Sequence, residues 1–171
     1  MFRAHRCQIC GETYLGTRKP DRCPFCGAAR EHLRTPGEWV RHGKIEVCEQ
    51  SRKDIERAID LEINNQTFYR CSAKATNNQI MESFFKRLAS QEGEHAELLC
   101  EMIGVEEPAM PEVTCSDDDS ENMKEAHFRE NRAIHFYLDV ANRAPEPRVQ
   151  EVFRALADIE SEHLIISSIY R

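Results

Sequence analysis

Two copies of one widely spaced pattern of glutamate and histidine limit what this 171-residue chain can fold into. In each copy, a lone glutamate is followed thirty positions later by a Glu-x-x-His motif. The copies are Glu62 with Glu92 and His95, and Glu130 with Glu160 and His163. Residues three apart on an α-helix share a face, so each motif aims a carboxylate and an imidazole at one target. Packed in a four-helix bundle, the two copies predict a carboxylate-bridged di-iron site.

The donor types favour this interpretation. Four carboxylates and two neutral imidazoles nearly balance two divalent cations, whereas the same carboxylates without metal would repel one another and take up protons. Oxygen and nitrogen donors of this kind suit iron or manganese better than copper or a structural zinc. A single Glu-x-x-His pair is common on a solvated helix face. Two pairs at matched spacing, on stripes that also carry apolar residues, indicate a buried site instead.

A tyrosine follows each lone glutamate by seven positions. Tyr69 and Tyr137 are therefore candidate catalytic residues, which would hydrogen-bond the bridging carboxylates or supply protons. The alternative is that each tyrosine only packs in the bundle core.

The N-terminal region carries two Cys-x-x-Cys pairs separated by twelve residues. The four cysteines are Cys7, Cys10, Cys23 and Cys26. Two such loops bring four thiolates into a tetrahedron that binds either zinc or iron tightly. A structural zinc ribbon is the main alternative to a redox-active iron centre. A disulfide pairing is disfavoured, because nothing in the sequence indicates secretion.

The remaining cysteines, Cys48, Cys71, Cys100 and Cys115, show no paired spacing. We expect all of them to be free thiols. The N-terminus has no apolar segment typical of a signal peptide, and no apolar run is long enough for a membrane helix. These features predict a cytoplasmic protein with no membrane partner. The net charge of −7 argues against nucleic-acid binding.

The chain divides into a metal knuckle at residues 1–34, a linker at 35–50 and a bundle at 51–171. A capping box of Ser51 and Asp54 is expected to start the first helix. Four helices are expected: from Ser51 to about residue 75, from after Asn78 to about Ile103, from about Ser120 to Arg143, and from Pro145 and Pro147 nearly to the C-terminus. The connection at 104–119 is long enough to run back along the bundle.

The chain resembles the rubrerythrin family in both regions. The segment CQICGETYLGTRKPDRCPFCGAA is similar to the rubredoxin-like knuckles of rubrerythrins. The six glutamates and histidines fall on the metal-ligand positions of the ferritin-like domain. The resemblance implies a mainly α protein, in which a ferritin-like four-helix bundle with a long crossover follows a rubredoxin-like domain. The domain order is the one found in "reverse" rubrerythrins.

One position departs from this pattern. Many rubrerythrins carry a further glutamate three residues after the lone glutamate of the third helix, and Ala133 occupies that position here. The remaining six ligands match the symmetric site of ferritins and bacterioferritins. His127, one turn before Glu130, is a possible additional ligand or a residue beside the ligands.

The resemblance implies a non-haem di-iron peroxidase that reduces hydrogen peroxide to water in oxidative-stress defence. Electrons would pass through the four-cysteine iron from a reductase or a rubredoxin, and zinc is the alternative metal at the cysteines. We expect a homodimer in which the knuckle of one subunit docks beside the di-iron site of the other. A ferroxidase or iron-handling protein that uses dioxygen is the first alternative, which Ala133 favours. A zinc-ribbon adaptor with a structural bundle is the second.

Overall fold

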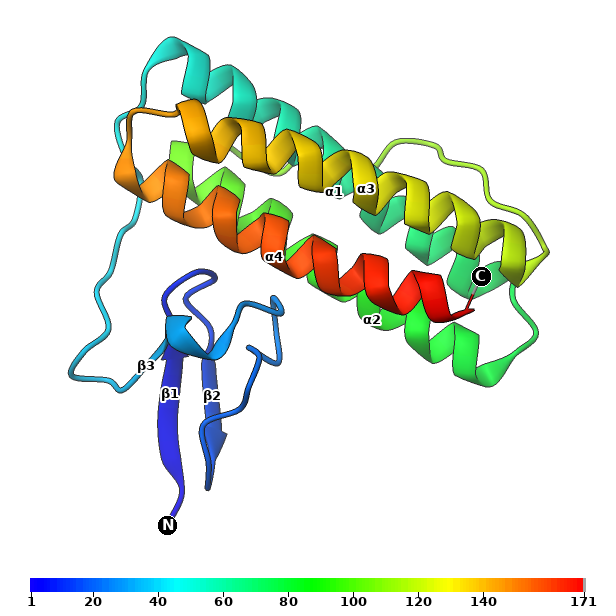
Figure 1. Cartoon of the computed structure of the whole chain (residues 1–171), viewed down its shortest axis with the longest axis horizontal. Helices are drawn as coiled ribbons and strands as arrows, with labels where there is room; N and C mark the ends of the chain where they lie inside the picture. The colour runs from blue at the N-terminus through cyan, green and yellow to red at the C-terminus, as the bar shows by residue number, and fades with distance from the viewer. Residues whose placement is uncertain (171) are drawn as a thin grey trace.

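The computed structural model describes residues 1–170, which form a small β-sheet domain followed by a bundle of long helices (Figure 1). The mainly α fold expected from the sequence is confirmed. The elements are β1 (Arg3–Cys7), β2 (Thr13–Gly16), the 3-10 helix η1 (Arg30–His32), β3 (Leu33–Arg34), α1 (Glu49–Ala75), α2 (Gln79–Ile103), α3 (Asp119–Arg143) and α4 (Pro147–Tyr170).

The helices pair as two hairpins, α1 with α2 and α3 with α4, and residues 104–118 form the crossover between them (Figure 1). The helix ends follow the local sequence. Asn78 and Asp118 cap α2 and α3 by accepting hydrogen bonds from backbone N–H groups of the first turn. Gly104 ends α2 with a φ of +67°, a left-handed conformation that glycine adopts without steric cost. Pro147 is the first residue of α4.

The start of α1 differs from the expected capping box. The helix begins at Glu49, and Cys48 caps it, because its Sγ accepts a hydrogen bond from the backbone N–H of Ser51 at 3.4 Å. The hydroxyl of Ser51 instead donates to Glu146, at 2.6 Å, before α4. Asp54 forms an ion pair with an arginine of α3. The predicted cap is wrong because both side chains bind groups from the other hairpin.

The N-terminal sheet has the order β2-β1-β3, with both neighbouring pairs antiparallel. Each Cys-x-x-Cys loop ends in a glycine with positive φ, Gly11 at +80° and Gly27 at +84°. The N–H of each glycine donates to the carbonyl of the first cysteine of its loop, at 3.0 Å in both cases. The two loops are therefore built in the same way, and their left-handed turns favour glycine.

The prediction of four free thiols outside the knuckle is wrong for two of them. Cys71 on α1 and Cys115 in the crossover form a disulfide, with a Cα–Cα distance of 5.9 Å. The pairing was not visible in the sequence, because it depends on the path by which the crossover returns along α1. Cys48 and Cys100 are free thiols. Among residues 1–170, no helix combines the length and the apolar character needed to cross a membrane.

Candidate metal centres

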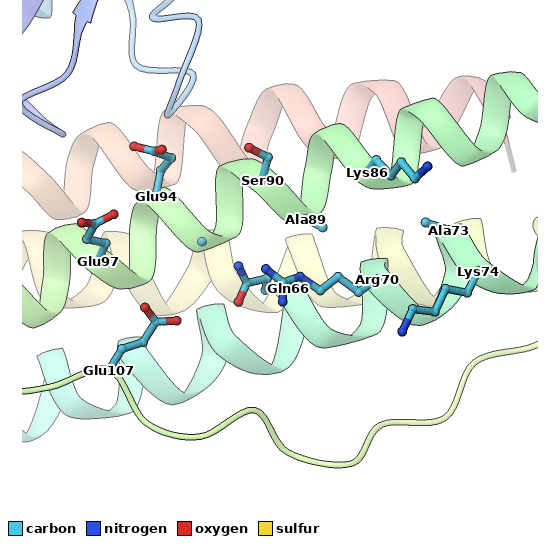
Figure 2. Close-up of a pocket in the computed structure, with 11 residues that line it drawn as sticks. Gln66, Arg70, Ala73, Lys74, Lys86, Ala89, Ser90, Glu94, Glu97 and Glu107 are labelled. Atoms are coloured by element: carbon cyan, nitrogen blue, oxygen red, sulfur yellow. The ribbon is translucent and has the colours of Figure 1, made fainter.

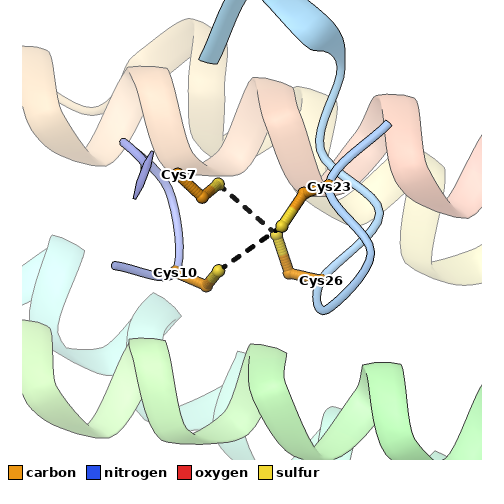
Figure 3. A group of neighbouring side chains, drawn as sticks. All are labelled: Cys7, Cys10, Cys23 and Cys26. Carbon is orange, nitrogen blue, oxygen red and sulfur yellow. Dashed lines mark hydrogen bonds between the residues drawn. The ribbon is translucent and has the colours of Figure 1, made fainter. Parts of the chain in front are cut away.

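The four knuckle cysteines converge at the side of the N-terminal domain that faces the bundle (Figure 3). Sγ of Cys7 lies 3.8 Å from Sγ of Cys26, and Sγ of Cys10 lies 3.8 Å from Sγ of Cys23. A tetrahedron with metal–sulfur bonds of about 2.3 Å has edges of roughly 3.8 Å, so the spacing fits a tetrahedral metal. Only Cys10 is partly exposed. The geometry fits iron and suits zinc equally well.

The second centre lies inside the bundle, and each helix contributes to it. The lone glutamates come from α1 and α3, and the Glu-x-x-His motifs come from α2 and α4. The six residues are at most 3% exposed. They form two overlapping groups, Glu62 with Glu92, His95 and Glu160, and His163 with Glu92, Glu130 and Glu160. The structure thus brings all six predicted ligands together, and Glu92 and Glu160 are shared by both groups.

Both histidines present Nδ1 to the carboxylates. Nδ1 of His95 lies 3.5 Å from Glu62 Oε2 and 3.5 Å from Glu160 Oε1. Nδ1 of His163 lies 3.0 Å from Glu160 Oε2 and 3.4 Å from Glu92 Oε1. The opposite nitrogens are held elsewhere: Nε2 of His95 donates to the Cys26 carbonyl at 2.8 Å, and Nε2 of His163 donates to Gln91 Oε1 at 3.0 Å. Such outer hydrogen bonds fix the tautomer of a metal-binding histidine.

The donor atoms that face the centre of this cluster lack other partners. Within the described chain, these atoms are buried and accept or donate no hydrogen bond: Glu62 Oε2, both carboxylate oxygens of Glu92, His95 Nδ1, Glu130 Oε2 and Glu160 Oε1. Orphaned buried polar groups are costly, and one cation in each of the two overlapping groups would satisfy them. The cluster therefore fits two metal ions.

The pKa shifts of the cluster residues agree with a site that binds cations. Burial, together with the charges of Glu160 and Glu62, raises the pKa of Glu92 well above its usual range. Burial and Glu160 do the same for Glu130. Burial alone would lower the pKa of His95, but the charge of Glu62 and the nearby carboxylates of Glu160 and Glu92 raise it well above its usual value. Without metal, protons must supply the positive charge that this cluster needs.

The two predicted tyrosines bind the carboxylates reciprocally. Tyr69 on α1 donates its hydroxyl proton to Glu130 on α3, and Tyr137 on α3 donates to Glu62 on α1. Both side chains are fully buried, and burial with the nearby carboxylate raises the pKa of each phenol well above 10. Both tyrosines therefore keep their protons while they hydrogen-bond a carboxylate of the cluster.

The knuckle is held against its own bundle by arginines that the sequence pattern did not predict. Arg148 on α4 donates to the carbonyls of Gln8 and Ile9, at 2.8 and 3.2 Å. Arg87 on α2 donates to carbonyls in the second cysteine loop, and Arg22 in the knuckle pairs with two carboxylates of α4. No periodic signal marks such residues, because their role depends on how the two domains dock.

Three further positions complete the surroundings of the site. Gln91, also unidentified from the sequence, lies between the bundle cluster and the second cysteine loop: it accepts from His163, and a Cβ added to Gly27 would lie 2.8 Å from its Nε2. Its position directly before Glu92 was the available signal. His127 is not among the ligands, since its Nδ1 faces the hydroxyls of Ser167 and Ser168 at 3.3 Å. Ala133 is fully buried.

The family models match both domains. The rubrerythrin model matches residues 53–166, about two thirds of the chain. The chain belongs to the rubrerythrin family. The model of the rubrerythrin rubredoxin-like domain matches residues 5–34, so the rubredoxin-like domain precedes the rubrerythrin domain. The expected domain order of a reverse rubrerythrin is confirmed.

A curated relative carries this reversed domain order in its name. The chain is 27% identical over 115 residues to Reverse rubrerythrin-1 of Clostridium acetobutylicum. The match covers 60% of this chain and 63% of the relative, which is less than two thirds of the relative's length. No solved structure gave a significant match. Family membership and the two clusters support a rubrerythrin that binds iron.

Proposed function

We propose that this rubrerythrin is a peroxidase that reduces hydrogen peroxide to two molecules of water. The reaction consumes two electrons and two protons, and an external reductase or rubredoxin would supply the electrons through the four-cysteine iron. The observation that carries the proposal is the 2.8 Å hydrogen bond from His95 Nε2 to the Cys26 carbonyl. The His95 side chain thereby faces the carboxylate cluster with one nitrogen and contacts Cys26, a residue of the thiolate cluster, with the other.

The chain's own residues would prepare each part of this reaction. Iron bound to the six carboxylate and imidazole ligands would supply the reducing electrons and the Lewis acidity. His95 and His163 are oriented by their Nε2 hydrogen bonds, so that Nδ1 remains available to a metal. Tyr69 and Tyr137 hold protons at their hydroxyls beside Glu130 and Glu62. Burial of the cluster excludes bulk water from the reacting site.

A stopped-flow experiment tests the electron route. Protein loaded with iron and fully reduced is mixed with hydrogen peroxide, and the thiolate iron is followed by its visible absorbance. We expect oxidation of the bundle irons, then oxidation of the thiolate iron as its electron moves inward. Cys10→Ser should keep the first turnover and lose sustained turnover with an external reductant. Equal sustained turnover in Cys10→Ser and the native protein would exclude the relay.

A ferroxidase is the second candidate function, and Ala133 favours it. The centre has two lone glutamates and two Glu-x-x-His pairs arranged symmetrically, with no further carboxylate at position 133. A ferroxidase would oxidise added ferrous iron with dioxygen faster than it reacts with hydrogen peroxide. It would also keep this activity with zinc at the four cysteines. Rates with the two oxidants, measured on iron-loaded and zinc-loaded knuckles, separate the candidates.

The proposal includes a homodimer. Within one chain the linker already allows the knuckle to reach its own bundle, so a contact between subunits is not required to bring the two centres together. Exchange of knuckles between two subunits would preserve the same contacts. Mixing Cys10→Ser with Glu92→Ala subunits tests this arrangement, because each subunit then retains one intact centre. Recovered peroxide reduction in mixed dimers supports exchange, and its absence supports transfer within one chain.

A further inference from the structure

The buried cluster requires a route by which an oxidant can reach it. All six ligands are almost fully buried, so the reacting molecule must pass between helices. A pocket with a volume of about 490 Å³ lies between α1 and α2, beside the crossover (Figure 2). Its lining includes Gln66, one helical turn after the ligand Glu62, and Gly93, next to the ligand Glu92. The pocket wall therefore includes residues adjacent to one ligand on each helix.

Gln66 has the features of a residue that controls passage. Its side chain extends from α1 into the space between the helices (Figure 2), yet the residue is only 5% exposed. Within residues 1–170, its Oε1 is buried and has no hydrogen-bond partner. A buried amide oxygen without a partner is costly, so a molecule that moves past this side chain toward the cluster would meet an acceptor with no competing partner.

Gly93 makes room for this amide. A Cβ at position 93 would collide with Nε2 of Gln66. Glycine in the middle of a helix costs about 1 kcal/mol relative to alanine. Here the missing side chain lets Gln66 lie across the inner wall of the pocket.

The pocket lining favours a small neutral molecule over an ion. Arg70, Lys74 and Lys86 lie toward one end, and Glu94, Glu97 and Glu107 toward the other (Figure 2). Beyond the inner wall, the bundle cluster contains four carboxylates. An anion would meet this negative charge, and any ion would lose its hydration inside the bundle. A molecule such as hydrogen peroxide both donates and accepts hydrogen bonds, as the glutamine amide does.

We propose that hydrogen peroxide reaches the carboxylate–histidine cluster through the pocket between α1 and α2, and that the Gln66 amide controls its passage. The choice of hydrogen peroxide rests on the proposed peroxidase function. The route itself rests on the pocket, the unpartnered amide and Gly93. Gln66 is a selectivity residue in this scheme: its length sets the size limit, and its amide hydrogen-bonds the passing molecule.

Two substitutions separate the size of Gln66 from its polarity. Gln66→Ala widens the route, so the rate with cumene hydroperoxide should rise at least about tenfold relative to the rate with hydrogen peroxide, the scale of a steric change in a binding pocket. Gln66→Met keeps the length and loses the amide, so the rate with hydrogen peroxide should fall up to about tenfold, the scale of one hydrogen bond. Gln79→Ala, the same change at the exposed start of α2, is the matched control and should leave both rates unchanged.

A second readout needs no turnover. Azide is supplied in mildly acidic buffer, where part of it is the neutral hydrazoic acid that this route would admit, and its binding to the oxidised protein is followed by absorbance. Gln66→Ala should accelerate this binding, while Gln79→Ala should not. Metal content and helical circular dichroism identify variants that fold. If Gln66→Ala fails to fold, Gln66→Met and Gly93→Ala carry the test, because a Cβ at 93 displaces the amide and should also change the azide rate.

The outcomes show separately whether the proposed route past Gln66 and the proposed peroxidase function are correct. Native rates with both oxidants and with azide in the Gln66 variants would overturn the route, even if the protein reduces peroxide. Faster azide binding in Gln66→Ala, in a protein that does not react with peroxide, would support the route and refute the peroxidase function.

Discussion

Removing the disulfide between Cys71 and Cys115 should destabilise the protein strongly. The two cysteines are 44 positions apart, and the closed loop contains α2 and most of the crossover. Cross-linking a loop of this length stabilises a protein by about 4 kcal/mol through the lost entropy of the unfolded chain. For a protein of this size, each kcal/mol shifts the unfolding temperature by roughly 2–4 °C. We therefore expect a decrease of roughly 8–16 °C.

The assay compares thermal unfolding of Cys71→Ala, Cys115→Ala and the double variant at equal metal content. Each single variant should lose nearly the full amount, and the double variant should lose little more, because either change alone breaks the cross-link. Reductant should lower the unfolding temperature of the native protein and leave that of the double variant unchanged. Cys100→Ala, which removes a buried free thiol, is the matched control and should keep the native response to reductant.

Two results would refute this reasoning. One is a thiol titration in which both Cys71 and Cys115 react after the unsubstituted protein has been unfolded without any reductant. The other is additive losses in the single variants, which would mean that each side chain contributes through packing and no shared bond.

Four other predictions concern the metal centres. Iron-replete protein should contain three irons per chain and be red when oxidised, by metal analysis and visible spectroscopy; one zinc and no colour would contradict the electron relay. Arg148→Ala removes hydrogen bonds to two knuckle carbonyls, so electron transfer between the centres should slow while the bundle still loads metal, which stopped-flow absorbance can measure. Tyr137→Phe should lower peroxide reduction by up to about tenfold, the scale of one hydrogen bond, and Tyr69→Phe should act similarly because the two contacts are reciprocal. Ala133→Glu should lower the reduction potential of the bundle irons, measured by spectroelectrochemistry, because an added anionic ligand stabilises the oxidised metals.

The sequence predicted the features that depend on helical periodicity. Glu92 and His95 share a face because they are three residues apart, and the equal spacing of the two copies places them at one level of the bundle. Gly104 ended α2 where expected, because its left-handed conformation is a local property. The bundle type and the composition of both clusters followed from such rules.

The features that the sequence did not predict depend on long-range docking. Cys115 reaches Cys71 only because of the path taken by the crossover, which has no periodic pattern. Arg148 and Gln91 act where the knuckle meets the bundle, and the relative position of two domains leaves no mark on local spacing. The hydroxyl of Ser51 bonded to Glu146 for the same reason.

The acceptor at the junction of the two centres is a main-chain atom, and this limits how mutation can alter it. His95 donates to the carbonyl oxygen of Cys26, which any amino acid at position 26 would also carry. A codon change there can abolish the thiolate but not the acceptor. On the knuckle side, inherited variation can therefore modify this junction only by moving the loop, through Gly27 or the arginines that hold it.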